Sequence, residues 1–293
     1  MVIPFLSHEV TSAPLPSATV MVLRDGQDGL EVLMVRRHGN AGVLGGAHVF
    51  PGGKLDPADA MVPAQALDLA PQACALRLGE TTLPVDAAVA LHVAALRETW
   101  EEVGLLLGLH GCQQSRWQAL AQRVAQGQDW STAMMAEGLT LPVSALVPWS
   151  RWITPRLPSV SSKRFDTRFF LARAPAGQTA SHDGHEATEA VWLSPREALH
   201  RFWSHDIDLA PPQIISLVDL SRHQDAASAW AHAAGRQPPL IEPHPFDRDG
   251  CRVICYPGDP EHPVPQPAWP GPTRLTFRNR RFEPDGGLAA LLP

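Results

Sequence analysis

The stretch from Arg97 to Glu102 constrains the fold of this chain more than any other. It ends a periodic apolar segment that begins near Asp86 and predicts a helix over residues 86–105. On such a helix, Glu98, Glu101 and Glu102 are related as i, i+3 and i+4, so three carboxylates share one face. Another face carries the residues expected to pack inward, which are Ala88, Leu91, Ala95 and Thr99.

Three carboxylates on one helix face repel one another, and each like-charge pair costs a few tenths of a kcal/mol. A hard divalent cation would reverse that effect, because carboxylate oxygens are the ligands such cations prefer. The same residues are also typical of a solvated acidic face, on which Arg97 would pair with Glu101. Taken alone, the helix leaves both interpretations open.

The upstream segment Phe50-Pro51-Gly52-Gly53-Lys54 favours the first interpretation. Together with the helix it resembles the signature of the Nudix hydrolase family, G-x5-E-x7-R-E-U-x-E-E-x-G-U, in which U is aliphatic. Gly53 takes the first position, and the second half is matched by Arg97, Glu98, Glu101, Glu102, Gly104 and Leu105. Asp59 stands in place of the first Glu, and residues 60–96 separate it from Arg97 where the signature has seven. We therefore interpret residues 60–84 as an insertion within the Nudix box.

Several blocks outside the box narrow the resemblance to one branch of the family. They are Gly46 to Gly53, Trp152-Ile153-Thr154-Pro155, Arg164 to Leu171, Trp192-Leu193-Ser194-Pro195 and Leu209 to Gln213. These blocks are similar to the branch that contains the mammalian peroxisomal coenzyme A diphosphatase with an interrupted box. The similarity spans about residues 17–220. The leader pattern of other coenzyme A enzymes is only partly matched, since Val35, His38 and Gly42 depart from it.

The resemblance implies a catalytic metal site for Mg²⁺ or Mn²⁺. Its ligands would be Glu98, Glu101, Glu102 and the backbone carbonyl of Gly52. Arg97 would hold Asp59 or a glutamate in place. Asp59 can equally be a helix cap, because it follows Pro57 closely and is one methylene shorter than Glu.

Residues outside the box are expected to complete the site. The resemblance suggests Glu186 as general base, with Glu189 nearer to the following strand but less well matched; either can also be a loop charge. Arg37 and Arg164 are the favoured pair to hold phosphate oxygens, and Phe50 is expected to contact the substrate. Further candidates for phosphate contacts are Arg36, Arg156 and Arg168, although each arginine alone is more typical of an ordinary surface residue.

The pattern along the chain indicates an α/β fold with a mixed sheet between helical layers. Strands are predicted over 17–23, 30–37, 48–50, 146–154, 164–172, 190–193, 251–256 and 274–282. Besides the central helix, helices are predicted over 64–78, 113–126, 132–137, 211–222 and 225–234, and one more after Ser194 with a capping box to Glu197. The resemblance implies a Nudix-type α/β/α sandwich over residues 1–235. We expect residues 236–293 to form a Pro-rich C-terminal extension packed on the same domain.

Composition limits the partners and the compartment. The net charge of −6 argues against a general binder of nucleic acid or membrane surfaces. The cysteines form no Cys-x2-Cys pair, the first residues lack a signal-peptide pattern, and no run of 18 apolar residues predicts a membrane span. We therefore expect a cytoplasmic protein, and the family resemblance allows a homodimer.

The resulting hypothesis is metal-dependent hydrolysis of a diphosphate bond in a nucleoside-linked substrate, with coenzyme A or an acyl derivative favoured. The first alternative is a pyrophosphatase for ADP-ribose, a dinucleotide or a nucleotide sugar. A second is a Nudix ligand-binding domain without turnover, and a third is an interaction module that uses the Pro-rich tail.

Overall fold

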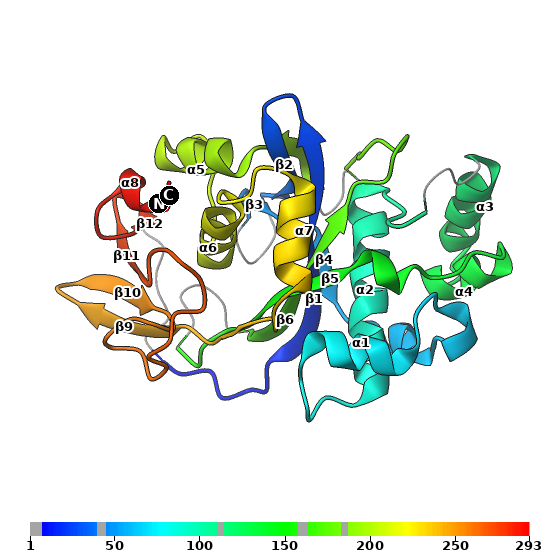
Figure 1. The fold of residues 1–293 in the computed structure, drawn as a ribbon, viewed down its shortest axis with the longest axis horizontal. Helices are drawn as coiled ribbons and strands as arrows, with labels where there is room; N and C mark the ends of the chain where they lie inside the picture. Colours follow the sequence, from blue (N-terminus) through cyan, green and yellow to red (C-terminus); the bar gives the residue numbers. More distant parts are fainter. Residues whose placement is uncertain (1–7, 40–44, 110–113, 158–162, 183–186, 293) are drawn as a thin grey trace.

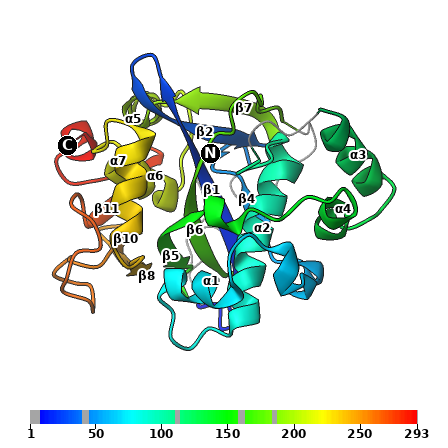
Figure 2. The same cartoon turned by 45° about the vertical axis from the view of Figure 1, so that its right-hand side comes forward.

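The computed structural model describes residues 8–39, 45–109, 114–157, 163–182 and 187–292. The chain forms a large mixed sheet with helices on both sides and a second, smaller sheet at one end (Figures 1 and 2). Helices α1 to α4 lie on one side of the large sheet and α5 to α7 on the other in both views. The expected α/β/α sandwich is confirmed.

Most strands and helices fall close to the predicted ranges, whereas β4, β8, β9 and α8 were not predicted. The strands are β1 (Leu15–Gly26), β2 (Gly29–Arg37), β3 (His48–Val49), β4 (Gly52–Lys54), β5 (Val147–Ile153), β6 (Phe165–Arg173), β7 (Ala187–Leu193), β8 (Leu240–Ile241), β9 (His244–Arg248), β10 (Cys251–Cys255), β11 (Arg274–Arg278) and β12 (Arg281–Glu283). The α-helices are α1 (Pro71–Leu78), α2 (Val85–Val103), α3 (Gln114–Ala125), α4 (Trp130–Ala136), α5 (Pro195–Trp203), α6 (Pro211–Leu220), α7 (Ala226–Ala234) and α8 (Leu288–Leu291). Three short 3-10 helices are η1 (Pro57–Met61), η2 (Ala64–Ala66) and η3 (Val143–Ala145).

Strand β1 organises the large sheet, whose order is β3-β2-β1-β6-β5-β8. Its two ends have different neighbours. Residues 23–26 pair with β2 in a hairpin, whereas residues 17–19 pair with β4. Along its other edge β1 runs parallel to β6. The strand therefore brings the Gly52–Gly53 segment and β6 to opposite sides of the same few residues.

Alternation along β1 divides the interior into two cores. Ala18, Val20 and Val22 face α2 and the insertion, while Met21 and Leu23 face α5, α6 and α7. Because α2 packs against the sheet on one side and against α1 and α4 on the other, residues 88–96 are all buried. The four residues predicted to face inward from this helix are buried as well.

Three local predictions were wrong in extent. The helix predicted over 64–78 starts only at Pro71, which occupies its first turn because proline lacks the N–H that later positions need. The strand predicted over 274–282 is a hairpin of β11 and β12, turned by Asn279 and Arg280 with φ of 49° and 64°. Ser194 caps α5 through the N–H of Glu197, but the Glu197 carboxylate binds Arg201 at 2.5 Å and does not return to the cap.

The C-terminal residues contact the rest of the chain through the sheet and through aromatic packing. Strand β8 adds to the outer edge of β5 in parallel. Trp269 stacks on Trp152 at 6.1 Å between ring centroids, and both rings lie near the fully buried Tyr256. Strands β9 to β12 form the second, antiparallel sheet beyond these rings.

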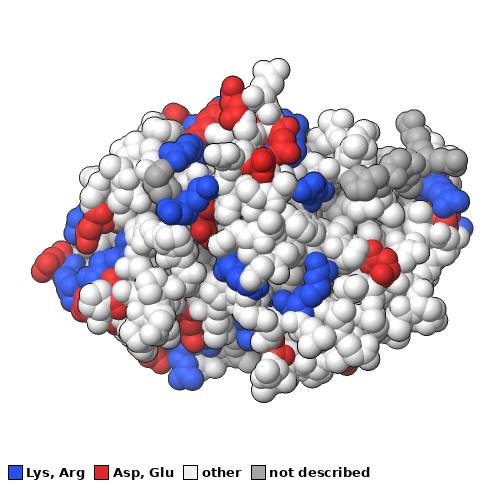
Figure 3. Space-filling view, viewed as in Figure 1, with Lys and Arg blue, Asp and Glu red and all other residues white. Residues whose placement is uncertain are grey.

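On the face shown in Figure 3, acidic and basic side chains are interspersed. Among the described residues, no helix has both the length and the apolarity needed to traverse a bilayer.

His92 makes folding sensitive to pH. His92 belongs to α2, and its ring is fully buried. Its Nδ1–H donates to the Ala88 carbonyl at 2.8 Å, and the ring packs on Phe170. Burial lowers the pKa of His92 from 6.5 to about 4. The unfolded chain therefore binds a proton that the folded chain excludes, and the free energy of unfolding should fall by up to about 3 kcal/mol as pH drops from about 6.5 to about 4.

Urea unfolding between pH 7 and pH 4 tests this prediction. The variant His92→Gln cannot titrate, so its free energy of unfolding should fall less steeply than that of the wild-type protein across this window. Equal slopes would show that His92 does not contribute.

Candidate metal centre

The carboxylates of the predicted metal site lie on the last two turns of α2. The helix ends at Val103, and Gly104 closes it in a left-handed conformation with φ of 70°. Glu98 and Glu102 are partly buried and Glu101 is exposed, whereas Thr99 between them is completely buried. The sequence therefore separates an inward face from an acidic face on the same turns.

The acidic face meets the backbone of β4. A Cβ on Gly53 would lie 2.4–2.5 Å from the carboxyl atoms of Glu98, so only glycine allows this approach. Gly52 has φ of +154°, and a Cβ there would lie 2.3 Å from the carbonyl oxygen of Ala18. The N–H of Gly52 donates to Glu102 at 3.1 Å. The two glycines thus bring main-chain atoms against two of the three glutamates.

Arg97 connects the two halves of the site. Its Nε and Nη2 donate to the two carboxylate oxygens of Asp59, each at 2.9 Å. Its Nη1 donates to Glu98 at 2.9 Å and to Glu101 at 2.8 Å. A further bond from Nη2 reaches the Lys54 carbonyl, so all five N–H groups of the guanidinium are used.

Asp59 pairs with Arg97 and is not itself the helix cap. Its side chain is 2% exposed and receives the bidentate contact from Arg97. The N-cap of η1 is Asp56, and Asp59 is the third residue of its capping box, where its carboxylate accepts from the N–H of Asp56 at 2.7 Å. The shorter side chain therefore reaches Arg97 because η1 carries it there.

The electrostatics of this group favour a bound cation. Burial opposes the positive charge of Arg97, but the hydrogen bond with Asp59 and the charges of Glu98, Asp59 and Glu101 outweigh it and raise the pKa of Arg97 above its ordinary value. Three carboxylates contact this one guanidinium and Glu102 lies on the same helix face, so the group carries an excess of negative charge.

The donor set fits a hard divalent cation. The groups on the acidic face are carboxylate oxygens beside a glycine backbone, which suit Mg²⁺ or Mn²⁺ better than softer metals. Within the described residues, no three His, Cys, Asp or Glu side chains are already assembled around a common point. Arg97 lies between Glu98 and Glu101, so metal binding would draw these carboxylates away from it.

The comparison with known families agrees with this geometry. Residues 10–220 match the family model described as the NUDT19 Nudix domain. The chain belongs to the Nudix hydrolase family. The matched range contains both halves of the Nudix box and the insertion between them.

The chain is similar to animal proteins and to a Nudix hydrolase of known structure. "Acyl-coenzyme A diphosphatase NUDT19" of Gallus gallus is 30% identical over 65% of this chain and 61% of its own length. The Homo sapiens protein of the same name is 30% identical over 71% of this chain and 65% of its own length. The chain thus spans less than two thirds of these relatives. A crystal structure of a Nudix hydrolase from Alicyclobacillus acidocaldarius is 29% identical, with a TM-score of 0.60 over 78% of this chain and 98% of that one.

The three residues expected to bind substrate lie in different surroundings. Arg37 ends β2, and its Nε is buried without a hydrogen-bond partner among the described residues. Arg164 is 7% exposed and donates to the carbonyls of Thr154 and Ser12. Phe50 is 2% exposed and packs edge-on against Phe169 in the core on the α6 side. Of the three, only Arg37 has a buried donor atom without a partner among the described residues, and the other two have evident packing roles.

Only one of the two acids proposed as general base lies among the described residues. Glu186 lies outside the described residues. Glu189 is on β7 opposite Arg36. Its carboxylate lies 3.8 Å from Nε2 of His48.

The contact between His48 and Glu189 was not predicted, because the two residues are far apart along the chain. Cross-strand pairing through Arg36 brings them to one face. Burial lowers the pKa of His48 although Glu189 opposes this, so the ring is held neutral.

Proposed function

We propose that this Nudix protein hydrolyses a diphosphate bond in a metal-dependent reaction, with coenzyme A or acyl-coenzyme A as the favoured substrate. The approach of the Gly52–Gly53 backbone to Glu98 and Glu102 is the observation that carries the proposal. Relatives named acyl-coenzyme A diphosphatase support the choice of substrate.

Each residue would have a defined task in this reaction. Glu98, Glu101, Glu102 and the Gly52 carbonyl would hold Mg²⁺ or Mn²⁺. When bound, such an ion neutralises charge on the diphosphate and lowers the pKa of water. The Arg97–Asp59 pair would keep the end of α2 aligned with β4 and so act as a positioning pair.

The covalent change is simple. A water oxygen forms a bond to one phosphorus, the bridging P–O bond breaks, and two phosphate monoesters leave. Glu186 or Glu189 would accept the proton of the attacking water. Arg37 would donate to phosphate oxygens, since its Nε has no partner in the described part of the chain.

Two alternatives predict different outcomes. Hydrolysis of ADP-ribose, a dinucleotide or a nucleotide sugar would use the same carboxylates. It stays an alternative because the leader pattern of coenzyme A enzymes is only partly matched. A ligand-binding domain without turnover is disfavoured because all three box glutamates are present on one face of α2.

A panel of diphosphates assayed with Mg²⁺ and with Mn²⁺ tests the proposal. Coenzyme A and an acyl derivative should release 3′,5′-ADP faster than ADP-ribose, a dinucleotide or a nucleotide sugar release their products, and EDTA should stop every reaction. Faster turnover of ADP-ribose would overturn the coenzyme A assignment but leave the diphosphatase standing. No turnover of any member would overturn both.

A further inference from the structure

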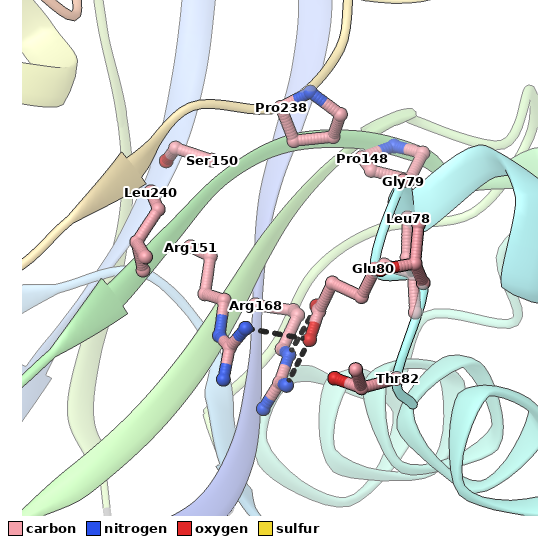
Figure 4. A pocket seen from close by; sticks show the side chains of 11 residues that line it. Leu78, Gly79, Glu80, Thr82, Pro148, Ser150, Arg151, Arg168, Pro238 and Leu240 are labelled. Carbon is pink, nitrogen blue, oxygen red and sulfur yellow. Dashed lines mark hydrogen bonds and ion pairs between the residues drawn. The ribbon is translucent and has the colours of Figure 1, made fainter. Parts of the chain in front are cut away.

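A cavity of about 260 Å³ lies beside α1 and outside the metal centre. Three separate parts of the chain line it: the end of the Nudix-box insertion at Glu80 and Thr82, strands β5 and β6 at Arg151 and Arg168, and the C-terminal segment at Leu240. Figure 4 shows the two arginines side by side with Glu80 in front of them. Two of the three walls come from the Nudix-box insertion and from the C-terminal segment, and neither segment belongs to an uninterrupted Nudix box.

The cavity is separated from the metal centre by β1 and α2. Ala18 pairs with Gly53 on one side and with Arg168 on the other. Helix α2 packs over this part of β1. The glutamates of α2 therefore reach the β4 side, whereas Arg168 belongs to the β6 side.

Two positive side chains stand directly opposite each other in the wall of this cavity. Arg151 and Arg168 are cross-strand partners on the antiparallel strands β5 and β6. Like charges in that position repel, and Arg168 is only 4% exposed. Such a pair is stable only with an anion held against it.

Glu80 is that anion in this structure. Its carboxylate accepts from Nε and Nη2 of Arg168 at 2.9 and 2.6 Å and lies 2.8 Å from Nη1 of Arg151. Asp166 contacts both arginines from the other side, at 2.8 and 2.9 Å. Asp166 belongs to the rigid strand β6, whereas Glu80 belongs to the turn between α1 and α2.

We propose that the paired guanidiniums of Arg151 and Arg168 form a second, phosphate-binding site, and that Glu80 occupies it until a phosphate group displaces it. A phosphate near neutral pH carries almost two negative charges where Glu80 supplies one. It also offers the oxygen geometry that arginine forks recognise. The cavity beside Glu80 provides the space for the phosphate, and the hydroxyl of Thr82 lies on its wall.

The exchange follows from the charge balance of this network. Without Glu80, the two guanidiniums would face Asp166 with an excess of positive charge beside the buried Arg168, and an incoming anion would offset that excess. Binding would free residues 79–84, which lead directly into α2. The site thus goes beyond diphosphate hydrolysis, and its test needs no turnover.

Titration with inorganic phosphate at constant ionic strength, followed by calorimetry, tests the proposal. The variant Glu80→Gln removes the competing charge and should bind phosphate at least about tenfold more tightly than the wild-type protein. Adding Arg151→Gln to that variant should abolish the gain. Glu31→Gln is the matched control, because it removes a carboxylate from Arg24 in the β1–β2 hairpin, and it should bind phosphate like the wild-type protein.

Equal affinity of Glu80→Gln and the wild-type protein would overturn the proposal, as would a gain that survives Arg151→Gln. A second measurement keeps the test independent of how well the variants fold. In the wild-type protein, hydrogen exchange of residues 79–84 should speed up in phosphate relative to chloride. Unchanged exchange at saturating phosphate would overturn the proposal and show that the network only holds the insertion in place.

Discussion

The double variant Glu101→Gln/Glu102→Gln should lose Mg²⁺-dependent release of 3′,5′-ADP from coenzyme A by at least about a thousandfold. Metal stabilisation of the transition state is worth several kcal/mol, and each 1.36 kcal/mol is a factor of ten in rate. Both side chains reach solvent, Glu101 with 39% of its side chain exposed, so amides of the same shape should leave the fold intact.

The measurement is product release by chromatography, together with Mn²⁺ binding and thermal unfolding. Mn²⁺ binding should weaken in parallel with activity, while the melting temperature stays close to that of the wild-type protein. Glu197→Gln is the control, because Glu197 and Arg201 form an exposed i, i+4 pair like that of Arg97 and Glu101. Wild-type turnover in a folded double variant would refute the assigned metal site.

Arg97→Met should be the most destabilising single substitution near the site, lowering the free energy of unfolding by about 3–5 kcal/mol. Arg97 is 12% exposed and Asp59 is 2% exposed, so the substitution leaves a buried carboxylate without its bidentate partner. Activity should fall as well, because Arg97 also aligns Glu98 and Glu101.

Urea unfolding of a double-mutant cycle separates these effects. Arg97→Met/Asp59→Asn should recover part of the lost stability, since the amide removes the unpaired charge. Arg201→Met, which breaks an exposed pair, should change stability by less than about 0.5 kcal/mol. A loss below about 1 kcal/mol for Arg97→Met would show that Asp59 finds other partners.

The helix, the glycines and their approach were predictable from local sequence. Helical spacing places Glu98, Glu101 and Glu102 on one face, and two successive glycines allow the backbone to come close. The role of Asp59 was not predictable, because its reach depends on η1, a short element whose capping residues also suit an ordinary turn. The β11–β12 hairpin was missed for a similar reason: Asn279-Arg280 lacks the glycine that usually marks such turns.

Residues that meet only through tertiary structure escaped prediction. Arg168 was a phosphate candidate by type, yet nothing in the sequence placed it opposite Arg151 or beneath Glu80. Likewise, Phe50 follows a glycine-rich block, but its ring turns into the core against Phe169. Sheet register and the path of the insertion decide these positions, and both depend on contacts between distant parts of the chain.

Strand β8 limits self-association of the protein through the edge of its large sheet. Without β8, β5 would be the edge strand of the large sheet. Its unpaired main-chain groups could then pair with a strand of another molecule. Only Leu240 and Ile241 pair there, and Pro238 and Pro239 directly before them cannot extend the ladder as donors. Because the new edge strand is short and preceded by two prolines, it offers few main-chain groups for pairing with a second molecule.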